Sequence, residues 1–406
     1  MTRTPLDDLS RRQLLRRAVV ATGAMFLSHG GTAPAARADE SPRPGPDPDF
    51  RKAIRPTPRT ARFILDDFYV WCGAPARSDD GVYHLLYSRW PRRLGHYAWV
   101  THSEVAHATA DSPLGPFKHQ GIALKGAGGD AWDAHCIHNP TVLRVGKKFY
   151  LYYMGNRGTG DYAAGPKADE AEKVKIDARW WSHRNNQRVG VAVADDPGGP
   201  WERVGPGGGK PDRPLIDVDP TPGSWDHLIA SNPSACPMPD GRFLMMYKTV
   251  ADGPPPGGGK VQHAVATADG PTGPFKRHPD PVLTHPTAKF PAEDPFIWHD
   301  PGAGGKGGKF RAIVKDNAGY FTGAGYSLAL FESADGLKWG PSAHVMVSKP
   351  TVRWADGEVQ TFLRMERPQL LLDAGVPRAL YVACDWDKDR SHSCNIALPL
   401  EWGEGV

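Results

Sequence analysis

Short runs of alternating apolar and polar residues occur in pairs along most of the chain, with a turn between the two runs of each pair. The clearest pairs lie at 139–155 and 232–248, and each begins with Asn-Pro and contains a Gly turn before a second run rich in aromatic residues. Related pairs lie at 74–88, 294–316 and 367–385. Alternation on both sides of a Gly-containing turn is typical of a β-hairpin. The pattern therefore predicts five hairpins.

A second motif recurs in phase with the hairpins. It reads ATADSPLGPF at 108–117, AVADDPGGPW at 192–201 and ATADGPTGPF at 266–275, with a degenerate fourth copy around Asp335. Its Pro and Gly residues force a turn between a third and a fourth strand. Four strands repeated five times at roughly 70-residue intervals predict an all-β fold, a five-bladed β-propeller whose four-stranded blades surround a central funnel.

The propeller is expected to span residues 59–402. The second unit is longer than the others, and the polar, Gly-rich segment 157–186 is interpreted as an inserted loop. The fifth unit lacks a clear fourth strand, so segment 59–69 is expected to pair with the C-terminal CNIALPLEW and close the ring. Residues 39–58, rich in Pro and charge, are predicted to be a flexible linker.

The first 38 residues have the layout of a twin-arginine export signal. Arg11-Arg12 precede an apolar run at 18–27 and the small-residue sequence Ala36-Arg37-Ala38. We expect cleavage after Ala38 and a periplasmic or extracellular protein. The apolar run is too short to span a bilayer, and no later segment reaches the ~18 uncharged residues that a span requires.

Charge and cysteine content narrow the function classes. Removing the six arginines and two aspartates of residues 1–38 from the 49 basic and 45 acidic residues of the chain leaves 43 of each. A neutral chain without basic runs argues against nucleic acid or a membrane as partner. The five cysteines form no Cys-x-x-Cys pair, which argues against a zinc site, and only Cys384 and Cys394 are close enough in sequence to suggest a disulfide.

In a propeller the innermost strand of each blade begins at the axis, so residues around each X-Pro dipeptide should converge on one pocket. Ionisable groups gathered there would shift one another's pKa values, as acid–base chemistry requires. These candidates are Trp71, Cys72, His135, His138, Asn139, His227, Asn232, Glu293, Asp294, Glu366 and Arg367, with Trp132 and Trp298 as further tryptophans near the funnel.

Purely structural roles compete with the functional ones. Asp294 could simply accept backbone N–H groups at a strand start, and His135 and His138 could be core or loop histidines. Arg89 and Glu104 are expected to form an ion pair within a blade, and Lys315 is expected at the rim rather than in the pocket.

The motifs NPTVLRVGKKFYLYYMG, AEDPFIW and the repeated turn resemble family 43 glycoside hydrolases and their relatives in families 32, 117 and 130, over about residues 60–400. The resemblance implies a five-bladed propeller in which an Asp before Pro acts as base or pKa modulator and a Glu in Glu-x-Pro acts as general acid. Glu-x-Pro matches Glu293-Asp294-Pro295 and Glu366-Arg367-Pro368, whereas Asp-Pro matches only Asp294.

The first blade departs from that pattern, because it reads Trp71-Cys72-Gly73-Ala74-Pro75 and carries no carboxylate. Either Asp66 or Asp67 replaces it, or the base comes from another blade, or the protein is not a family 43 type of hydrolase. Asn139-Pro140 and Asn232-Pro233 are similar to the phosphorolytic mannosidase family. A histidine acid, as in family 117, would involve His135 or His138.

The sequence thus predicts an exported glycoside hydrolase that acts on a plant or algal polysaccharide or its oligosaccharides by carboxylate acid/base catalysis. A non-catalytic carbohydrate-binding propeller and a glycoside phosphorylase remain alternatives. No cofactor is required, a Ca²⁺ ion in the channel is compatible with the sequence, and no oligomeric state is assigned. The expected catalytic residues are Glu293, Asp294, Glu366 and Asp67, and the expected substrate-binding residues are Trp71, His135, His138, Asn139, Asn232, Arg367 and Trp298.

Overall fold

The computed structural model describes residues 43–159, 173–302, 305 and 307–403, which fall within one compact unit, Pro42–Val406. The expected export signal at 1–38 and the first residues of the expected linker lie outside the described residues. No helix in the described part of the chain is long and apolar enough to cross a membrane.

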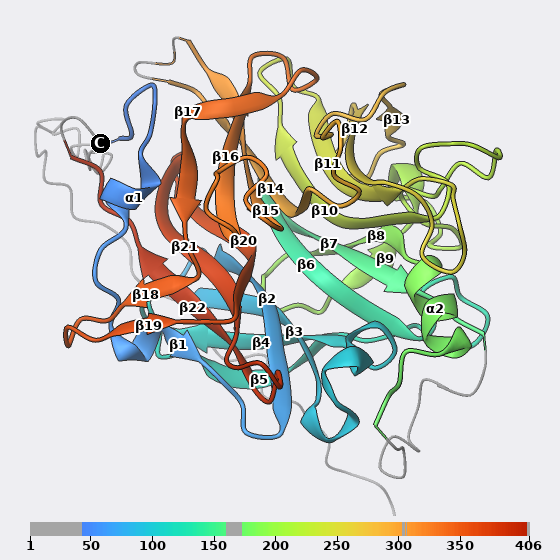
Figure 1. The fold of residues 1–406 in the computed structure, drawn as a ribbon, viewed down its shortest axis with the longest axis horizontal. Helices are drawn as coiled ribbons and strands as arrows, with labels where there is room; N and C mark the ends of the chain where they lie inside the picture. Colours follow the sequence, from blue (N-terminus) through green and yellow to red (C-terminus); the bar gives the residue numbers. More distant parts are fainter. Residues whose placement is uncertain (1–42, 160–172, 303–304, 306, 404–406) are drawn as a thin grey trace, which may run out of the picture. The chain divides into compact units, whose positions relative to one another are not determined.

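Five antiparallel four-stranded sheets follow one another along the chain as blades (Figure 1). Blade 1 contains β2 (Phe68–Arg77), β3 (Tyr83–Pro91), β4 (Glu104–Ala110) and β5 (Lys118–Leu124). Blade 2 contains β6 (Cys136–Val145), β7 (Lys148–Asn156), β8 (Arg188–Ala194) and β9 (Glu202–Val204). Blade 3 contains β10 (Ile229–Pro237), β11 (Phe243–Val250), β12 (Val261–Ala268) and β13 (Lys276–Arg277).

Blade 4 contains β14 (Ala292–Asp300), β15 (Lys309–Asp316), β16 (Ser327–Ser333) and β17 (Gly340–Ser348). Blade 5 contains β20 (Arg364–Asp373), β21 (Val376–Asp385), β22 (Ser393–Pro399) and β1 (Arg62–Phe63). Each innermost strand contacts the innermost strands of both neighbouring blades, and β2 contacts β20, so the five blades form a closed ring. The predicted five-bladed β-propeller is confirmed.

The ring is closed by strands from opposite ends of the propeller sequence. Arg62 and Phe63 in β1 pair antiparallel with Ile396 and Asn395 in β22, so β1 supplies the fourth strand of blade 5. Phe63 packs edge-on against Tyr87 of blade 1. The expected pairing of segment 59–69 with the C-terminal strand is therefore confirmed, and it covers an edge that would otherwise be unpaired.

The recurring turn motif connects the third and fourth strands of blades 1 to 3. Gly115, Gly199 and Gly273 have φ values of 72°, 91° and 75°, a backbone region that side chains other than glycine rarely adopt. Phe117 and Trp201, which end the first two copies, are buried, and Phe275, which ends the third, is partly buried. The motif thus reverses the chain and seals the outer edge of the blade.

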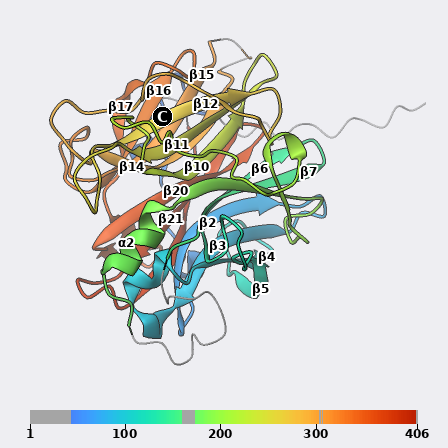
Figure 2. The same cartoon turned by 90° about the vertical axis from the view of Figure 1, so that its right-hand side faces the viewer.

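Short helices and one extra strand pair decorate the blades. They are α1 (Phe50–Ala53), α2 (Ala178–Asn185), the 3₁₀ turns η1 (Arg59–Ala61), η2 (Arg92–Leu94), η3 (His96–Val100) and η5 (Pro206–Gly208), and the pair β18 (Thr351–Arg353) and β19 (Val359–Thr361). The described part of segment 157–186 includes α2, where the sequence suggested only a loop. Asp177 caps this helix, and α2 lies outside the sheets and contacts η3 (Figure 2).

The predicted linker at 39–58 is wrong in its second half, because residues 49–57 pack on the propeller. Phe50 in α1 is 1% exposed and lies edge-on to Trp298 and Trp402, with ring centroids 6.4 and 5.1 Å away. Ile54 forms a β-bridge with Leu400. The prolines and charged residues give this segment the composition of a linker, but Phe50 buries enough apolar surface to hold it on the propeller.

The five cysteines are all buried and free. Cys384 and Cys394 face each other across β21 and β22, so the sequence correctly placed them close together, but they are not joined as a disulfide. The expected ion pair between Arg89 and Glu104 is present at 2.9 Å.

Replacing Phe50 by Ala should lower the free energy of unfolding by about 3–5 kcal/mol, because it empties a closed apolar site. Denaturant unfolding measures the change. Lys52→Ala, two residues away on the exposed side of α1, should change it by less than about 0.5 kcal/mol. Equal effects of the two substitutions would contradict the packing of this segment.

Candidate active site

A bulge interrupts every innermost strand at the same point. The register shifts between Trp71 and Ala74, His138 and Thr141, Ser231 and Ser234, Glu293 and Phe296, and Glu366 and Gln369. One residue in each bulge has a positive φ: Cys72 (55°), Asn139 (55°), Asn232 (52°), Asp294 (59°) and Arg367 (52°). Such a conformation costs of order 1–3 kcal/mol in a residue other than glycine. We call these five the axial residues.

The residue after each axial residue explains where the bulge forms. It is Gly73 in blade 1 and a proline in the other four blades. Proline has no N–H to donate to the neighbouring strand, so the ladder must break there. The bulge also changes the direction of the side chains, and both Glu293 and Asp294, successive residues of β14, line the same cavity.

Hydrogen bonds link the axial residues to one another across the blades. The Cys72 thiol donates to Asn139 Oδ1 (2.9 Å), the Asn139 amide donates to Asn232 Oδ1 (2.6 Å), and the Asn232 amide donates to Asp294 Oδ1 (2.5 Å). The Arg367 backbone N–H donates to Asp294 Oδ2 at 3.3 Å. The strain of the five bulges is thus offset by a buried polar network that links the axial residues, although Nε and Nη1 of Arg367 are buried without a hydrogen-bond partner among the described residues.

This network forms a floor across the channel. Gln369 of blade 5 donates to Thr141 of blade 2 (3.3 Å), and the Arg367 guanidinium donates to the Pro140 carbonyl oxygen (3.4 Å). These contacts cross the axis between blades that are not neighbours. The hollows at the two ends of the axis are therefore separated by buried side chains.

A cavity of about 310 Å³ lies on the side of this floor where the innermost strands begin. Its size falls at the lower end of the range usual for small-molecule sites, roughly 300–1,000 Å³. Five aromatic side chains contribute to its wall: Trp71, Trp90, Trp99, Phe290 and Tyr326. Charged side chains lie beside them: Lys248, Glu293, Asp294, Lys315, Arg364, Glu366 and Arg390.

Glu293 is held between two ammonium groups. Its Oε1 lies 2.5 Å from Lys248 Nζ and its Oε2 lies 2.7 Å from Lys315 Nζ. Burial would raise the pKa of Glu293, but the two lysines outweigh it and hold the pKa well below its usual value. Glu293 is therefore ionised at any pH at which the protein would work, which does not support it as a general acid.

Glu366 shares Lys315 with Glu293. Its Oε1 lies 3.1 Å from Lys315 Nζ and 3.6 Å from Arg364 Nη1, but neither contact has the alignment of a hydrogen bond. Glu293 Oε2 and Glu366 Oε1 contact the same Lys315 Nζ, at 2.7 and 3.1 Å. These two oxygens are therefore closer together than the roughly 6.5–9.5 Å that separates the two carboxyl groups of an inverting glycosidase.

Two aspartates have environments opposite to that of Glu293. Burial and then the charge of Glu293 raise the pKa of Asp294 to about 6. Asp385, at the end of β21, is 1% exposed, and burial followed by the charge of Glu366 raises its pKa to about 7. A carboxyl with a raised pKa and one with a lowered pKa therefore stand next to each other in β14.

The structure brings most of the expected site residues together. Trp71, His138, Asn139, Asn232, Glu293, Asp294 and Glu366 line the cavity, and Arg367 lies in its floor. His138 is 3% exposed, bonds Ser103 Oγ at 2.8 Å and packs against Trp90 and Trp99. Burial and Arg367 lower the pKa of His138 well below its usual value, so the ring is neutral.

Three of the expected residues lie elsewhere. Asp67 is exposed, and its backbone carbonyl accepts the N–H of Arg92 at 2.9 Å. His135 bonds the ring of His183 at 3.2 Å, outside the cavity. Trp298 is buried in the core near Phe50. It lies beyond the bulge of β14 and lines the hollow at the other end of the axis.

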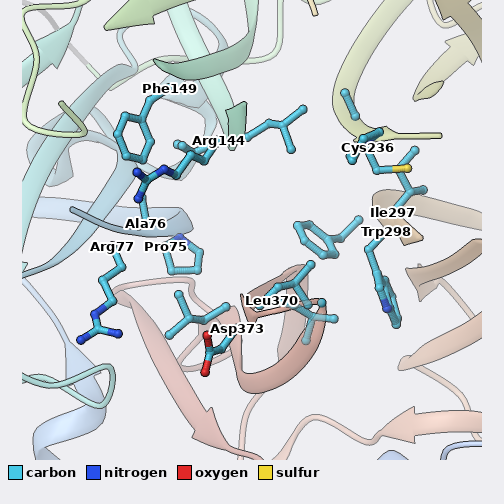
Figure 3. Close-up of a pocket in the computed structure, with 18 of the residues that line it drawn as sticks. Pro75, Ala76, Arg77, Arg144, Phe149, Cys236, Ile297, Trp298, Leu370 and Asp373 are labelled. Carbon is cyan, nitrogen blue, oxygen red and sulfur yellow. The ribbon is translucent and has the colours of Figure 1, made fainter. Parts of the chain in front are cut away.

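That other end holds a larger hollow of about 630 Å³, shown in Figure 3. Pro75, Phe149, Ile297, Trp298 and Leu370 surround it, with Arg77, Arg144 and Asp373 at its edge (Figure 3). None of the carboxylates of the first cavity lines it. The two ends of the axis thus differ in chemistry, and the candidate active site is the smaller, charged one.

Sequence reasoning missed the basic side chains of this site. Lys248 lies opposite Ser231 and Lys315 opposite Glu293 in the neighbouring strand, so each is the cross-strand partner of the residue just before an axial residue. Both end the second strand of a repeated hairpin, and Lys315 was expected at the rim. Aligning the hairpins as antiparallel pairs would have found both. Arg390 and His96 come from connections, which the repeat does not predict.

Within the described ranges, no group of three or more His, Cys, Asp or Glu side chains is arranged to hold a metal ion. A Ca²⁺ ion in the channel therefore stays an untested prediction.

Comparisons with known proteins give matches for the fold only. No protein-family model and no curated sequence matches the chain. Among solved structures, Zg3597, a family 117 glycoside hydrolase of the marine bacterium Zobellia galactanivorans, is 17% identical with a TM-score of 0.52 over 85% of this chain and 89% of its own. A second structure, described as a glycoside hydrolase, is 14% identical with a TM-score of 0.57 over 88% and 95%.

A mutant alpha-L-arabinanase of Cellvibrio cellulosa is 15% identical with a TM-score of 0.52 over 84% of this chain and 95% of its own. The chain therefore has the five-bladed β-propeller fold found in these glycoside hydrolases. At such identities the likeness defines the architecture, and function has to be argued from the site itself.

Asp385→Asn should become increasingly stabilising as the pH rises from about 4 to about 7 and then level off. The folded pKa of about 7 lies above the unfolded value of about 3.9, so between these values the unfolded chain has released a proton that the folded protein keeps, and the wild type loses stability with rising pH, whereas asparagine does not titrate. Melting temperatures of the variant and the wild type across this range measure the trend. Asp79→Asn removes an exposed carboxylate as control. A difference that stays constant or shrinks with pH would contradict the buried, protonated carboxyl.

Proposed function

We propose that this protein is an exported glycoside hydrolase that cleaves glycosidic bonds in a plant or algal polysaccharide or its oligosaccharides. The observation that carries the proposal is the charged cavity at the start of the innermost strands, where carboxyl groups of blades 4 and 5 meet beneath an aromatic wall. The structural neighbours support it, since they include a family 117 glycoside hydrolase and an arabinanase of the same fold.

The walls of the cavity suit a sugar. Trp99 is partly exposed and offers flat apolar surface of the kind that covers the C–H face of a pyranose, Trp71 and Trp90 are buried in the same wall, and the Asn139 and Asn232 side chains lie at the floor. Because the floor is closed, a glycan cannot thread through the axis. The proposed substrate therefore enters with one end of its chain.

The proposed proton transfer uses the two carboxyl groups of β14, Glu293 and Asp294, because their surroundings shift their pKa values in opposite directions. Neighbouring carboxyls with opposed environments are the usual sign of an acid and a base working together. In the proposal Asp294, with its pKa of about 6, holds the proton for the leaving oxygen, and ionised Glu293 balances the positive charge that develops on the sugar. The sequence suggested Glu293 or Glu366 as the acid and Asp294 as its partner, but Lys248 and Lys315 keep Glu293 ionised.

Glu366 is the third carboxyl of the proposed machinery. Its side chain lines the cavity beside Glu293, and in the proposal this carboxylate receives the proton of the attacking water. Lys315 joins it to Glu293 and keeps the two carboxylates in place. In this arrangement Asp294 donates, Glu366 receives, and Glu293 remains charged throughout.

A binding function without catalysis is favoured by one observation. Blade 1 places the Cys72 thiol at the axis, where the family 43 pattern has a carboxylate, and burial raises the pKa of this thiol well above its usual value. A propeller with a neutral group there could hold a glycan without hydrolysing it. The kinetic experiment below separates the two functions.

Glu293→Gln and Asp294→Asn should each lower kcat by about 10²–10⁴-fold, the usual contribution of a positioned acid or base. The assay screens arabinan, xylan, agar and carrageenan oligosaccharides and then measures kcat on any substrate found, with Asp79→Asn, an exposed carboxylate, as matched control. Wild-type kcat should fall as the pH rises through about 6, where Asp294 loses its proton. Binding of a glycan with no cleavage in any variant or in the wild type would establish the binding function instead.

Export is tested separately. Arg11→Lys together with Arg12→Lys should leave the protein inside the cell, because the twin-arginine signal is read through both arginines. Fractionation of an expressing bacterium and immunoblotting locate the protein. Arg16→Lys, outside the arginine pair, is the control. Unchanged appearance of the double variant outside the cytoplasm would overturn the proposed route.

A further inference from the structure

Two arginines in the candidate active site are not used by the proposed proton transfer. Arg364 begins β20 and Arg390 lies in the connection between β21 and β22, and both line the 310 Å³ cavity. Their side chains are 28% and 19% exposed, so each guanidinium is partly open to the cavity. Both act on the same buried carboxyl, because Arg364 is the cross-strand partner of Asp385 and Arg390 approaches it from the connection.

Neither guanidinium is satisfied by the protein. Arg364 lies 3.6 Å from Glu366, and Arg390 lies 3.6 Å from Asp385, distances beyond those of an N–H···O hydrogen bond. Among the described residues, no side-chain hydrogen bond from either guanidinium to a protein atom is present. Arg364 is instead supported from one side by the ring of Tyr326, 5.3 Å from its centroid. Most N–H groups of each guanidinium therefore remain available to bind a ligand.

The lysines of the same cavity provide a contrast. Lys248 and Lys315 both donate to Glu293, and Lys315 also lies 3.1 Å from Glu366, so the two ammonium groups face two carboxyl groups inside the protein. The carboxyl nearest to Arg390 offers less compensation, because burial and Glu366 raise the pKa of Asp385 to about 7 and neither of its oxygens accepts a hydrogen bond. His96, which faces the same two arginines, is neutral because burial and their charges lower its pKa to about 3.

The charge of the cavity is therefore positive on the side of blade 5. Four cationic side chains line it against three carboxylates, and one of those three, Asp294, has its pKa raised to about 6. Two open guanidinium forks on one side of a partly dry hollow match a planar or tetrahedral oxyanion, which they can bind in a bidentate manner.

We propose that Arg364 and Arg390 form a subsite for an acidic substituent of the sugar, a carboxylate or a sulfate ester, so that the substrate of this cavity is an anionic glycan. Binding of the anionic glycan does not require cleavage. The proposal rests on the proposed glycoside hydrolase function only in that the bound glycan would then be cleaved. A neutral sugar would leave both forks facing water, whereas an acidic one would complete their hydrogen bonds. The pair also fixes the orientation of the sugar, because the anion must lie toward blade 5 and the rest of the ring over Glu293 and Asp294.

Calorimetric titration of the full mature protein with paired ligands tests the subsite directly. The pairs are galacturonate with galactose, glucuronate with glucose, and galactose 6-sulfate with galactose, all at one ionic strength. At least one acidic member should bind about tenfold or more tightly than its neutral partner, the gain expected of a charge-assisted bidentate contact. Arg364→Gln and Arg390→Gln should each reduce this ratio toward one.

Matched variants separate recognition from loss of folding or of charge alone. Arg390→Lys keeps the charge but removes the fork, and should retain only part of the preference. Arg144→Gln, at the edge of the hollow at the other end of the axis, should leave the ratio unchanged (Figure 3). Circular dichroism of each variant establishes that it is folded, and the ratio is compared only among folded proteins.

Equal affinity for every acidic and neutral pair in the wild type would overturn the proposal. Tight binding of inorganic phosphate, with no preference for acidic sugars, would also overturn it and would favour phosphorolysis. Selective binding of acidic sugars without cleavage of any glycan would leave the subsite standing and remove the hydrolase function. Cleavage of neutral glycans without such selectivity would overturn the subsite and leave the hydrolase function standing.

Discussion

The ring of axial residues, linked by a chain of hydrogen bonds from Cys72 to Arg367, is the constraint on which the rest of this propeller depends. Five innermost strands approach one axis, and each must break its ladder there because a proline or glycine follows the axial position. A left-handed residue in each bulge costs free energy, and buried polar side chains would cost more if left unpaired. The hydrogen bonds among Cys72, Asn139, Asn232, Asp294 and the Arg367 backbone offset part of both costs.

The chemistry of the site follows from this ring. Since the bulge turns Glu293 and Asp294 toward one cavity, two adjacent carboxyls face the same small volume, and they cannot both be ionised without help. The lysines at the ends of the neighbouring strands decide which one is charged, because they approach Glu293 and leave Asp294 beside a negative neighbour. The opposed pKa values thus arise from strand register.

The floor formed by the ring also separates the two ends of the axis. On one side aromatic rings and ionised groups surround a small cavity, and on the other side apolar residues of the same five strands surround a larger one. Position along each strand explains the difference. Residues just before the bulge, among them Trp71, Glu293 and Glu366, face the first cavity, whereas consecutive residues beyond the bulge, such as Phe296–His299, line the second.

The repeat in the sequence determined the number of blades, the turn between third and fourth strands, and the closure of blade 5 by residues 62–63, because these depend on local pattern and on Pro and Gly. It also placed Glu293, Asp294, Glu366 and the two axial asparagines at the axis. The tertiary structure alone decided which carboxyl has the raised pKa, moved Trp298, His135 and Asp67 out of the site, and brought Lys248, Lys315, Arg364 and Arg390 into it. Those outcomes depend on cross-strand partners and on connections, whose distances are fixed only when the blades pack together.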